Sequence, residues 1–264
     1  MTSSIAQSAS GGAPLAAPKD ALKAHVSAVI ELVQDSPFMF ASPLGPFWLG
    51  ERSTLLPRFV FFGPHASQES WRLAILAGVS GGDYRSSHAL LALAERLYRE
   101  AETGHGLHLA LFPVVDASAL YLDEPDRRLG SAHWGRSQAP EIALLEKDCR
   151  LKGYDGFIRV ETAPEAENLA TLRIRGSAVE ALSPDLELIS TEETGPVPIR
   201  FELADGPAES GPLSVADDLP LAPFELTLSL PASWPDVIYQ NAVGLLLQRF
   251  LWRYRAFQAY AQHL

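Results

Sequence analysis

The segment Ser80–Asp83 combines a hydroxyl group and a carboxylate with two consecutive glycines. It follows the apolar run Leu73–Val79, which is too short for a helix of its own and predicts a buried strand. Glycine allows the backbone to turn sharply and lets another group approach it closely. Ligands of open α/β sheets bind beyond the carboxyl ends of the strands, so Ser80 and Asp83 are predicted to lie at a site. A plain turn between a strand and a helix is the alternative.

The run Ala77–Asp83 resembles the first zinc-binding motif of the zinc carboxypeptidase superfamily, which includes succinylglutamate desuccinylases and aspartoacylases. The family pattern is Ala-Gly-(Ile/Val)-His-Gly-(Asn/Asp)-Glu, in which the His and the Glu bind the metal. Ser80 stands at the His position and Asp83 at the Glu position. The resemblance therefore implies that the residue pattern of the motif is kept while its metal ligands are replaced.

Two later segments resemble further motifs of the same family. The run Tyr154–Thr162 looks like the strand that supplies the third metal ligand, and Glu161 occupies the position of that His. The run Phe224–Pro231 resembles the Thr-x-Glu-x-Pro element, and Ser229 stands where the general-base Glu belongs. A serine hydroxyl cannot act as a base near neutral pH. The resemblance therefore implies that this chain cannot hydrolyse a substrate by the family mechanism.

The resemblance also indicates where a substrate would be bound. The end of the run Leu107–Val115 is similar to the family's Pro-x-x-Asn-Pro-x-Gly turn, beyond which the family carries a substrate-binding arginine. Arg127 or Arg128 could bind a carboxylate from this stretch. The family's Asn-Arg pair is replaced by His133 and the following Trp134, so His133 is a third candidate binding residue.

Asp83 and Glu161 are expected to converge at the carboxyl ends of the central strands. Two carboxylates about 4 Å apart repel each other by roughly 4 kcal/mol at an effective dielectric constant near 20. A shared proton, an oxygen-coordinated cation or an arginine would relieve this repulsion. The candidate arginines are Arg85, Arg136 and Arg159.

The fold is predicted as α/β, with a mixed, mostly parallel central sheet and helices on both faces. Buried strands alternate with helical patterns, the strands beginning near Leu73, Leu107 and Phe157 and the helices near Ser87, Glu141 and Asp236. The resemblance covers roughly residues 40–255 and implies a zinc-carboxypeptidase-like fold. Residues 1–19 are rich in Ser, Ala, Gly and Pro and are expected to form a flexible arm, followed by a single domain over residues 20–264.

Composition narrows the range of partners and compartments. The formal net charge of -11 opposes binding to nucleic acid, and no apolar stretch has the length of a membrane span. The sequence also shows no secretory signal, so a cytoplasmic protein is expected. The single cysteine, Cys149, excludes an internal disulfide and is expected to be a packed thiol. The aromatic C-terminal helix over 237–260 offers a surface for a homo-oligomer.

Three functions remain open at this point. The first is a noncatalytic carboxypeptidase-like protein that holds no cofactor and binds a small or peptide-like ligand in the old cleft. The second is an active hydrolase of carboxypeptidase or acyl-amino-acid deacylase type, with zinc or another divalent cation held by a rearranged set that recruits His65, His88 or His133. The third is an unrelated α/β protein.

Overall fold

A computed structural model describes the backbone of residues 18–67, 70–122, 127–129, 139–163, 169–175, 199–203 and 224–261, and the side chains of these segments as far as residue 252. The strands are β1 (Met39–Ala41), β2 (Leu44–Leu49), β3 (Arg52–Leu56), β4 (Phe59–Phe62), β5 (Trp71–Leu76), β6 (Leu107–Phe112), β7 (Gly156–Ala163), β8 (Ala170–Arg175), β9 (Ile199–Leu203) and β10 (Phe224–Pro231). The helices are α1 (Pro18–Leu32), α2 (Tyr84–Arg99), α3 (Pro140–Lys152) and α5 (Asp236–Ala261), with short 3-10 turns η1 (Ala101–Gly104) and η2 (Ala117–Leu120).

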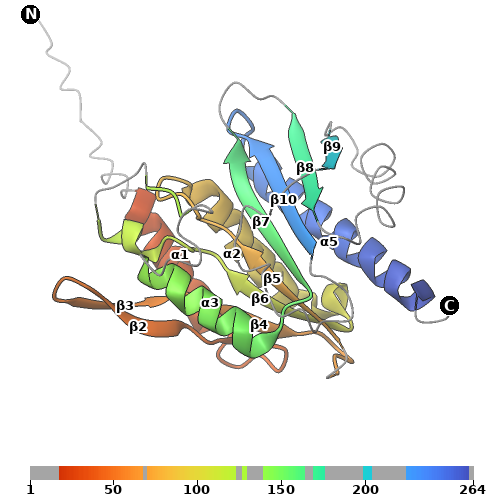
Figure 1. Cartoon of the computed structure of the whole chain (residues 1–264), viewed down its shortest axis with the longest axis horizontal. Helices are drawn as coiled ribbons and strands as arrows, with labels where there is room; N and C mark the ends of the chain where they lie inside the picture. Colours follow the sequence, from red (N-terminus) through yellow and green to blue (C-terminus); the bar gives the residue numbers. More distant parts are fainter. Residues whose placement is uncertain are drawn as a thin grey trace, which may run out of the picture.

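An eight-stranded sheet in the order β1-β4-β6-β5-β7-β10-β8-β9 forms the centre of the molecule (Figure 1). Its four middle strands, β6, β5, β7 and β10, run parallel to one another. β4 and β8 join them in the antiparallel direction, and β2 pairs with β3 in a separate hairpin. The predicted α/β class with a mixed, mostly parallel sheet is therefore confirmed. Because the middle strands are parallel, their carboxyl ends share one edge of the sheet.

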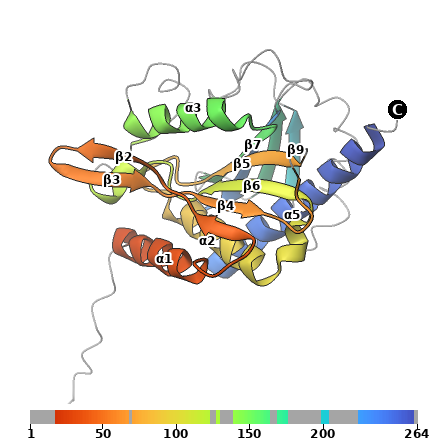
Figure 2. The same cartoon turned by 90° about the horizontal axis from the view of Figure 1, so that it is seen from below.

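Helices cover both faces of the sheet, as predicted (Figure 2). α1, α2 and α5 pack on one face, where alternate strand residues such as Leu73, Ile75, Ile158 and Leu228 are completely buried. α3 and the β2-β3 hairpin pack on the other face, and Cys149 of α3 is buried there. The prediction of a packed thiol is thus confirmed.

The face beneath α3 changes character at β7. Its central positions on β5 and β6, Ala74, Leu76, Ala110 and Phe112, are apolar, whereas most positions after Phe157 on β7, and most on β10, β8 and β9, are polar. We call these polar positions the polar strip: Arg159 and Glu161 on β7, Thr227 and Ser229 on β10, Thr171 and Arg173 on β8, and Arg200 and Glu202 on β9. Side chains alternate between the two faces of a strand, so residues two apart stand on the same face. On this face of the sheet, the polar strip offers the side chains that can bind polar or charged groups.

Several sequence-based expectations concern residues outside this description. The N-terminal arm falls almost entirely within residues 1–17, and both His133 and Arg136 lie in the segment 130–138. Among the described residues no helix is both long enough and apolar enough to cross a membrane.

Candidate functional site

The turn after β5 depends on Gly78. Its φ is 60°, in the left-handed region that favours glycine, and a Cβ atom there would overlap the hydroxyl of Ser87. The Gly78 N–H donates to the Ser86 hydroxyl at 3.1 Å, which ties the turn to the first turn of α2. Ser80 then forms an isolated β-bridge with Arg128, so the segment 127–129 lies alongside the turn.

Asp83 is the N-cap of α2. Its Oδ1 accepts the Ser86 N–H at 3.2 Å and the Thr162 hydroxyl at 2.6 Å, and its Oδ2 accepts the Thr162 N–H at 2.9 Å. As the N-cap, its carboxylate satisfies a free N–H group in the first turn of the helix. Asp83 therefore joins a helix to a strand rather than facing an open site.

Tyr239 of α5 extends this network. Its hydroxyl lies 3.0 Å from Thr162 Oγ1, and because Oγ1 donates to Asp83, the tyrosine hydroxyl is the donor in this second bond. Burial raises the pKa of Tyr239 above its usual value, and the nearby negative charge of Asp83 adds to this effect. Tyr239 is consequently a neutral donor.

Glu161 lies beside two guanidinium groups and one hydroxyl. Its Oε2 is 3.1 Å from Arg128 Nη2 and 3.4 Å from Arg159 Nε, and its Oε1 accepts the Ser229 hydroxyl at 3.4 Å. Ser229 is also the register partner of Glu161 on the neighbouring parallel strand. The Glu161 carboxylate is thus neutralised by arginine, which is one of the three possibilities that the sequence left open.

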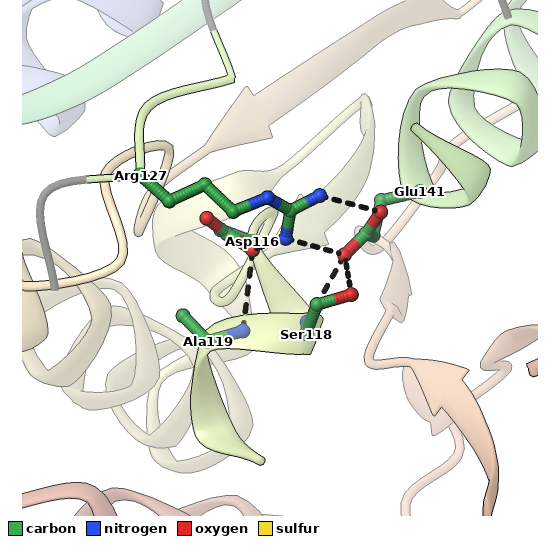
Figure 3. Close-up of polar contacts among 5 residues, drawn as sticks. All are labelled: Asp116, Ser118, Ala119, Arg127 and Glu141. Carbon is green, nitrogen blue, oxygen red and sulfur yellow. Dashed lines mark hydrogen bonds and ion pairs between the residues drawn. The ribbon is translucent and has the colours of Figure 1, made fainter. Parts of the chain in front are cut away.

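Arg127 points into the protein, towards the carboxylates of Asp116 and Glu141 (Figure 3). It donates to Asp116 and, at 3.1 and 3.3 Å, to the two carboxylate oxygens of Glu141. Both carboxylate side chains are completely buried. Burial opposes ionisation of Glu141, but hydrogen bonds from Arg127 and Ser118 outweigh it and lower the pKa of this carboxyl group. In this structure Arg127 therefore binds internal carboxylates.

Two of the three histidines considered as recruited metal ligands lie away from Glu161. His65 follows β4, which runs antiparallel to β6. It therefore lies near the amino ends of the parallel strands, away from their carboxyl ends, and packs against His105. His88 is on α2, with its Nδ1 2.8 Å from Nδ1 of His25 in α1. Each of these two histidines therefore packs against another histidine.

Arg85 also serves a structural role. It donates to the backbone carbonyls of Ala232 and Trp234, and its Nε lies 2.9 Å from Asp236 Oδ1. It fixes the start of α5 to the start of α2 and does not neutralise the site carboxylates, for which it was one candidate.

The residues at the family's ligand positions do not fit zinc. A catalytic zinc ion needs three protein donors, normally imidazole, thiolate or carboxylate, and an open position. Asp83 is occupied by hydrogen bonds from Thr162 and Ser86, and a cation at Glu161 would face the guanidinium groups of Arg128 and Arg159. In the segments whose side chains are described, no three or more His, Cys, Asp and Glu side chains are grouped so that they could hold a metal.

Sequence reasoning missed several participants. Thr162, Tyr239 and the buried pair Asp116 and Glu141 complete the hydrogen-bond networks, yet none was proposed as a site residue. The only local signal was their polar type at strand ends or in apolar surroundings, which does not identify a partner.

Solved structures show the same fold. A metallo-carboxypeptidase from Burkholderia cenocepacia superposes with a TM-score of 0.68 at 13% identity, covering 88% of this chain and 68% of that one. A metallo-carboxypeptidase from Pseudomonas aeruginosa, in complex with (2-guanidinoethylmercapto)succinic acid, gives 0.62 at 14% identity, with 88% and 68% covered. An aspartoacylase family protein from Mesorhizobium loti gives 0.57 at 14% identity, with 81% and 68% covered.

These similarities confirm the predicted carboxypeptidase- and aspartoacylase-like fold. No protein-family model matches the chain, and no curated protein matches it in sequence. At this identity the likeness is one of fold.

Proposed function

We propose that this carboxypeptidase-like chain is a noncatalytic protein that binds a small or peptide-like ligand at the carboxyl edge of its central strands. The observation that carries the proposal is the position of Glu161 between Arg128 and Arg159, at distances of 3.1 and 3.4 Å. Arginine side chains surround the carboxylate that a metal-dependent hydrolase would need for its metal ion. The fold is kept, while the charges at the site belong to side chains of the protein.

The chemistry of the neighbouring groups supports binding over hydrolysis. Hydrolysis needs an activated water, produced by a metal ion or by a general base. Ser229 at the base position offers only a hydroxyl, which donates to Glu161. Asp83 is held by Thr162 and by its own helix, so it is not available to take a proton from water.

The polar groups at this edge suit a ligand with charges of both signs. Arg128 is 57% exposed and Glu161 is 23% exposed, so a cationic and an anionic group lie side by side within reach of solvent. The backbone of Arg128 is held by its bridge to Ser80, which limits the backbone entropy lost when the residue binds a ligand. Amino acids and short peptides offer the complementary pattern.

Metal analysis and activity assays test the noncatalytic part of the proposal. Purified protein is expected to contain less than one equivalent of zinc and to cleave neither C-terminal amino acids from peptides nor acyl groups from N-acyl-amino acids. The same assays are repeated after chelation and reloading with zinc. Stoichiometric zinc retained through dialysis, with activity lost in chelator and restored by metal, would establish the active metal-dependent hydrolase instead.

A thermal-shift screen of amino acids and short peptides tests the binding part. A ligand present at a hundred times its dissociation constant stabilises the folded state by about 2.7 kcal/mol. The shift should shrink in Arg128→Gln and persist in Arg99→Gln, since Arg99 lies on α2 and pairs with Glu95. A shift that is equal in both variants would place the ligand elsewhere.

A further inference from the structure

α1 is held on the molecule mainly by α2. It lies on the face of the sheet opposite the polar strip, where it packs against α2 and, less extensively, against η2 (Figure 2). Its residues Leu22, Val26 and Val29 are buried in this layer. A peripheral helix that rests on one neighbouring helix opens at a lower free energy than the central strands do. The polar contacts between α1 and α2 therefore contribute to how firmly α1 is held.

Two imidazole rings meet where α1 crosses α2. Nδ1 of His25 on α1 lies 2.8 Å from Nδ1 of His88 on α2, and the rings are stacked with their centroids 5.0 Å apart. Nε2 of His25 lies 3.1 Å from Oε1 of Glu95, which is further along α2. Both histidines are only partly buried, so protons from solvent can reach them.

The partners of His25 determine where the hydrogens of the pair lie. An ionised carboxylate only accepts hydrogen bonds, so Nε2 of His25 carries the hydrogen that is donated to Glu95. In a neutral ring the other nitrogen is then an acceptor, so Nδ1 of His88 donates to Nδ1 of His25. One hydrogen therefore lies between the two Nδ1 atoms, and Nε2 of His88 keeps its lone pair.

The pair can accept one proton from solution but not two. A first proton binds at Nε2 of His88, and His88 still donates from Nδ1 to the neutral His25. A second proton would bind at Nδ1 of His25, so that both Nδ1 atoms would carry a hydrogen and neither could accept one. The two rings would also carry like charges with their centroids only 5.0 Å apart. The contact is therefore incompatible with two protonated rings.

The neighbouring charges leave this conflict in place. The charged groups next to the pair, in sequence or in space, are Lys23 and Asp20 of α1, Arg85, Glu95 and Arg99 of α2, and Asp236 of α5. Burial lowers the pKa of His88, the positive charge of His25 adds to the shift, and Asp236 opposes it. Glu95 can compensate a charge on His25, but it also pairs with Arg99 at 2.9 Å.

We propose that the contact between His25 and His88 is a pH-sensitive device, which holds α1 against α2 near neutral pH and loosens α1 in acid. Because the folded-state pKa of His88 is lowered, the contribution of the pair to stability is complete above the unfolded value of 6.5. This contribution is lost as pH falls below 6.5. The apolar side of α1, with Leu22 and Val26, then becomes accessible more often.

Hydrogen exchange of the full chain, followed by mass spectrometry at pH 7.5 and pH 5.0, tests the proposal. Protection factors of α1, corrected for the intrinsic effect of pH on exchange, are compared with those of the β2-β3 hairpin, which does not contact the pair. Protection of α1 should fall about tenfold at the lower pH, as expected for the loss of one hydrogen bond, while the hairpin changes much less. An unchanged α1, or an equal fall in the hairpin, would overturn the proposal.

Variants separate the histidine pair from general effects of acid. His88→Asn places an amide that can donate to or accept from His25 and does not titrate, so protection of α1 should change less than about twofold between the two pH values. His105→Gln is the matched control, because His105 pairs with Glu102 of η1 and its loss should leave the tenfold response in place. His25→Asn is the second variant if His88→Asn does not fold. A full response of α1 in the folded pair variants would refute the device.

Titration of the histidine side chains by NMR gives an independent readout. In the parent chain the signals of His25 and His88 should follow two separated steps that the pair shares, whereas His25 should titrate in a single step in His88→Asn. Independent titration of both histidines at their ordinary pKa would overturn the proposal. Because α1 lies on the face opposite the polar strip, none of these outcomes depends on ligand binding at Glu161.

Discussion

Asp83 and Thr162 are 79 positions apart in the sequence and are joined by two hydrogen bonds, of 2.6 and 2.9 Å. The same carboxylate caps α2, so one side chain fixes the helix after β5 to the end of β7. A residue that stands at a metal-ligand position of the family pattern thus has a structural role in this chain.

Asp83→Ala should lower the free energy of unfolding by about 2–4 kcal/mol, because the variant loses the cap of α2 and leaves the Thr162 N–H without its acceptor. Urea unfolding followed by circular dichroism measures the change. Asp20→Ala is the control, since Asp20 is 58% exposed and pairs only across one turn with Lys23, a contact worth about 1 kcal/mol at most. A similar loss in both variants would contradict the cross-linking role.

Arg127→Met should destabilise the fold by about 3–5 kcal/mol, because it leaves the buried carboxylates of Asp116 and Glu141 without their cation. Arg128→Met changes the next residue, whose side chain is 57% exposed, and should cost about 1 kcal/mol or less. Urea unfolding of the two variants gives the difference. Equal losses would show that the Arg127 ion pairs are not what holds this region.

The Arg127 effect should depend on pH. The folded-state pKa of Glu141 is lowered, so its contribution to stability is present above the unfolded pKa and is lost as pH falls through the folded value. The deficit of Arg127→Met relative to the parent chain should therefore shrink in acid. Unfolding curves at pH 7 and at successively lower pH check this trend.

His108 should make the fold less stable in mild acid. Burial, together with the positive charges of Arg72, Lys152 and Arg58, lowers the pKa of His108 from 6.5 to about 4. The unfolded chain takes up this proton below pH 6.5 and the folded chain does not, so the contribution is complete above 6.5 and decreases as pH falls towards 4. His108→Gln should flatten the stability profile over this window. An unchanged profile would contradict the assignment.

Cys149 should be inert in the folded protein. It is 4% exposed, and burial raises its pKa well above the usual range, with the negative charge of Asp148 adding to the shift. A thiol reagent such as DTNB reacts with the thiolate, so labelling at pH 8 should be slow in buffer and complete in denaturant. Rapid stoichiometric labelling of the native chain would show that this helix opens readily.

The sequence by itself determined the elements and the residue types at the site. The strands near Leu73 and Phe157 could be predicted because a buried strand is recorded locally, as a short apolar run bounded by turn residues. The carboxypeptidase-like fold could be predicted because the motifs keep the family's order along the chain and its positions at strand ends. Ser80, Glu161 and Ser229 could be assigned to changed positions for the same reason.

Only the tertiary structure decided what those side chains contact. Arg127 and Arg128 are adjacent and chemically identical, yet one binds buried carboxylates and the other reaches Glu161. The pairing of Arg173 with Glu202 likewise depends on β8 lying beside β9. Such contacts are set by strand order and register, which join residues far apart in the chain. A pattern confined to a few neighbouring residues does not contain that information.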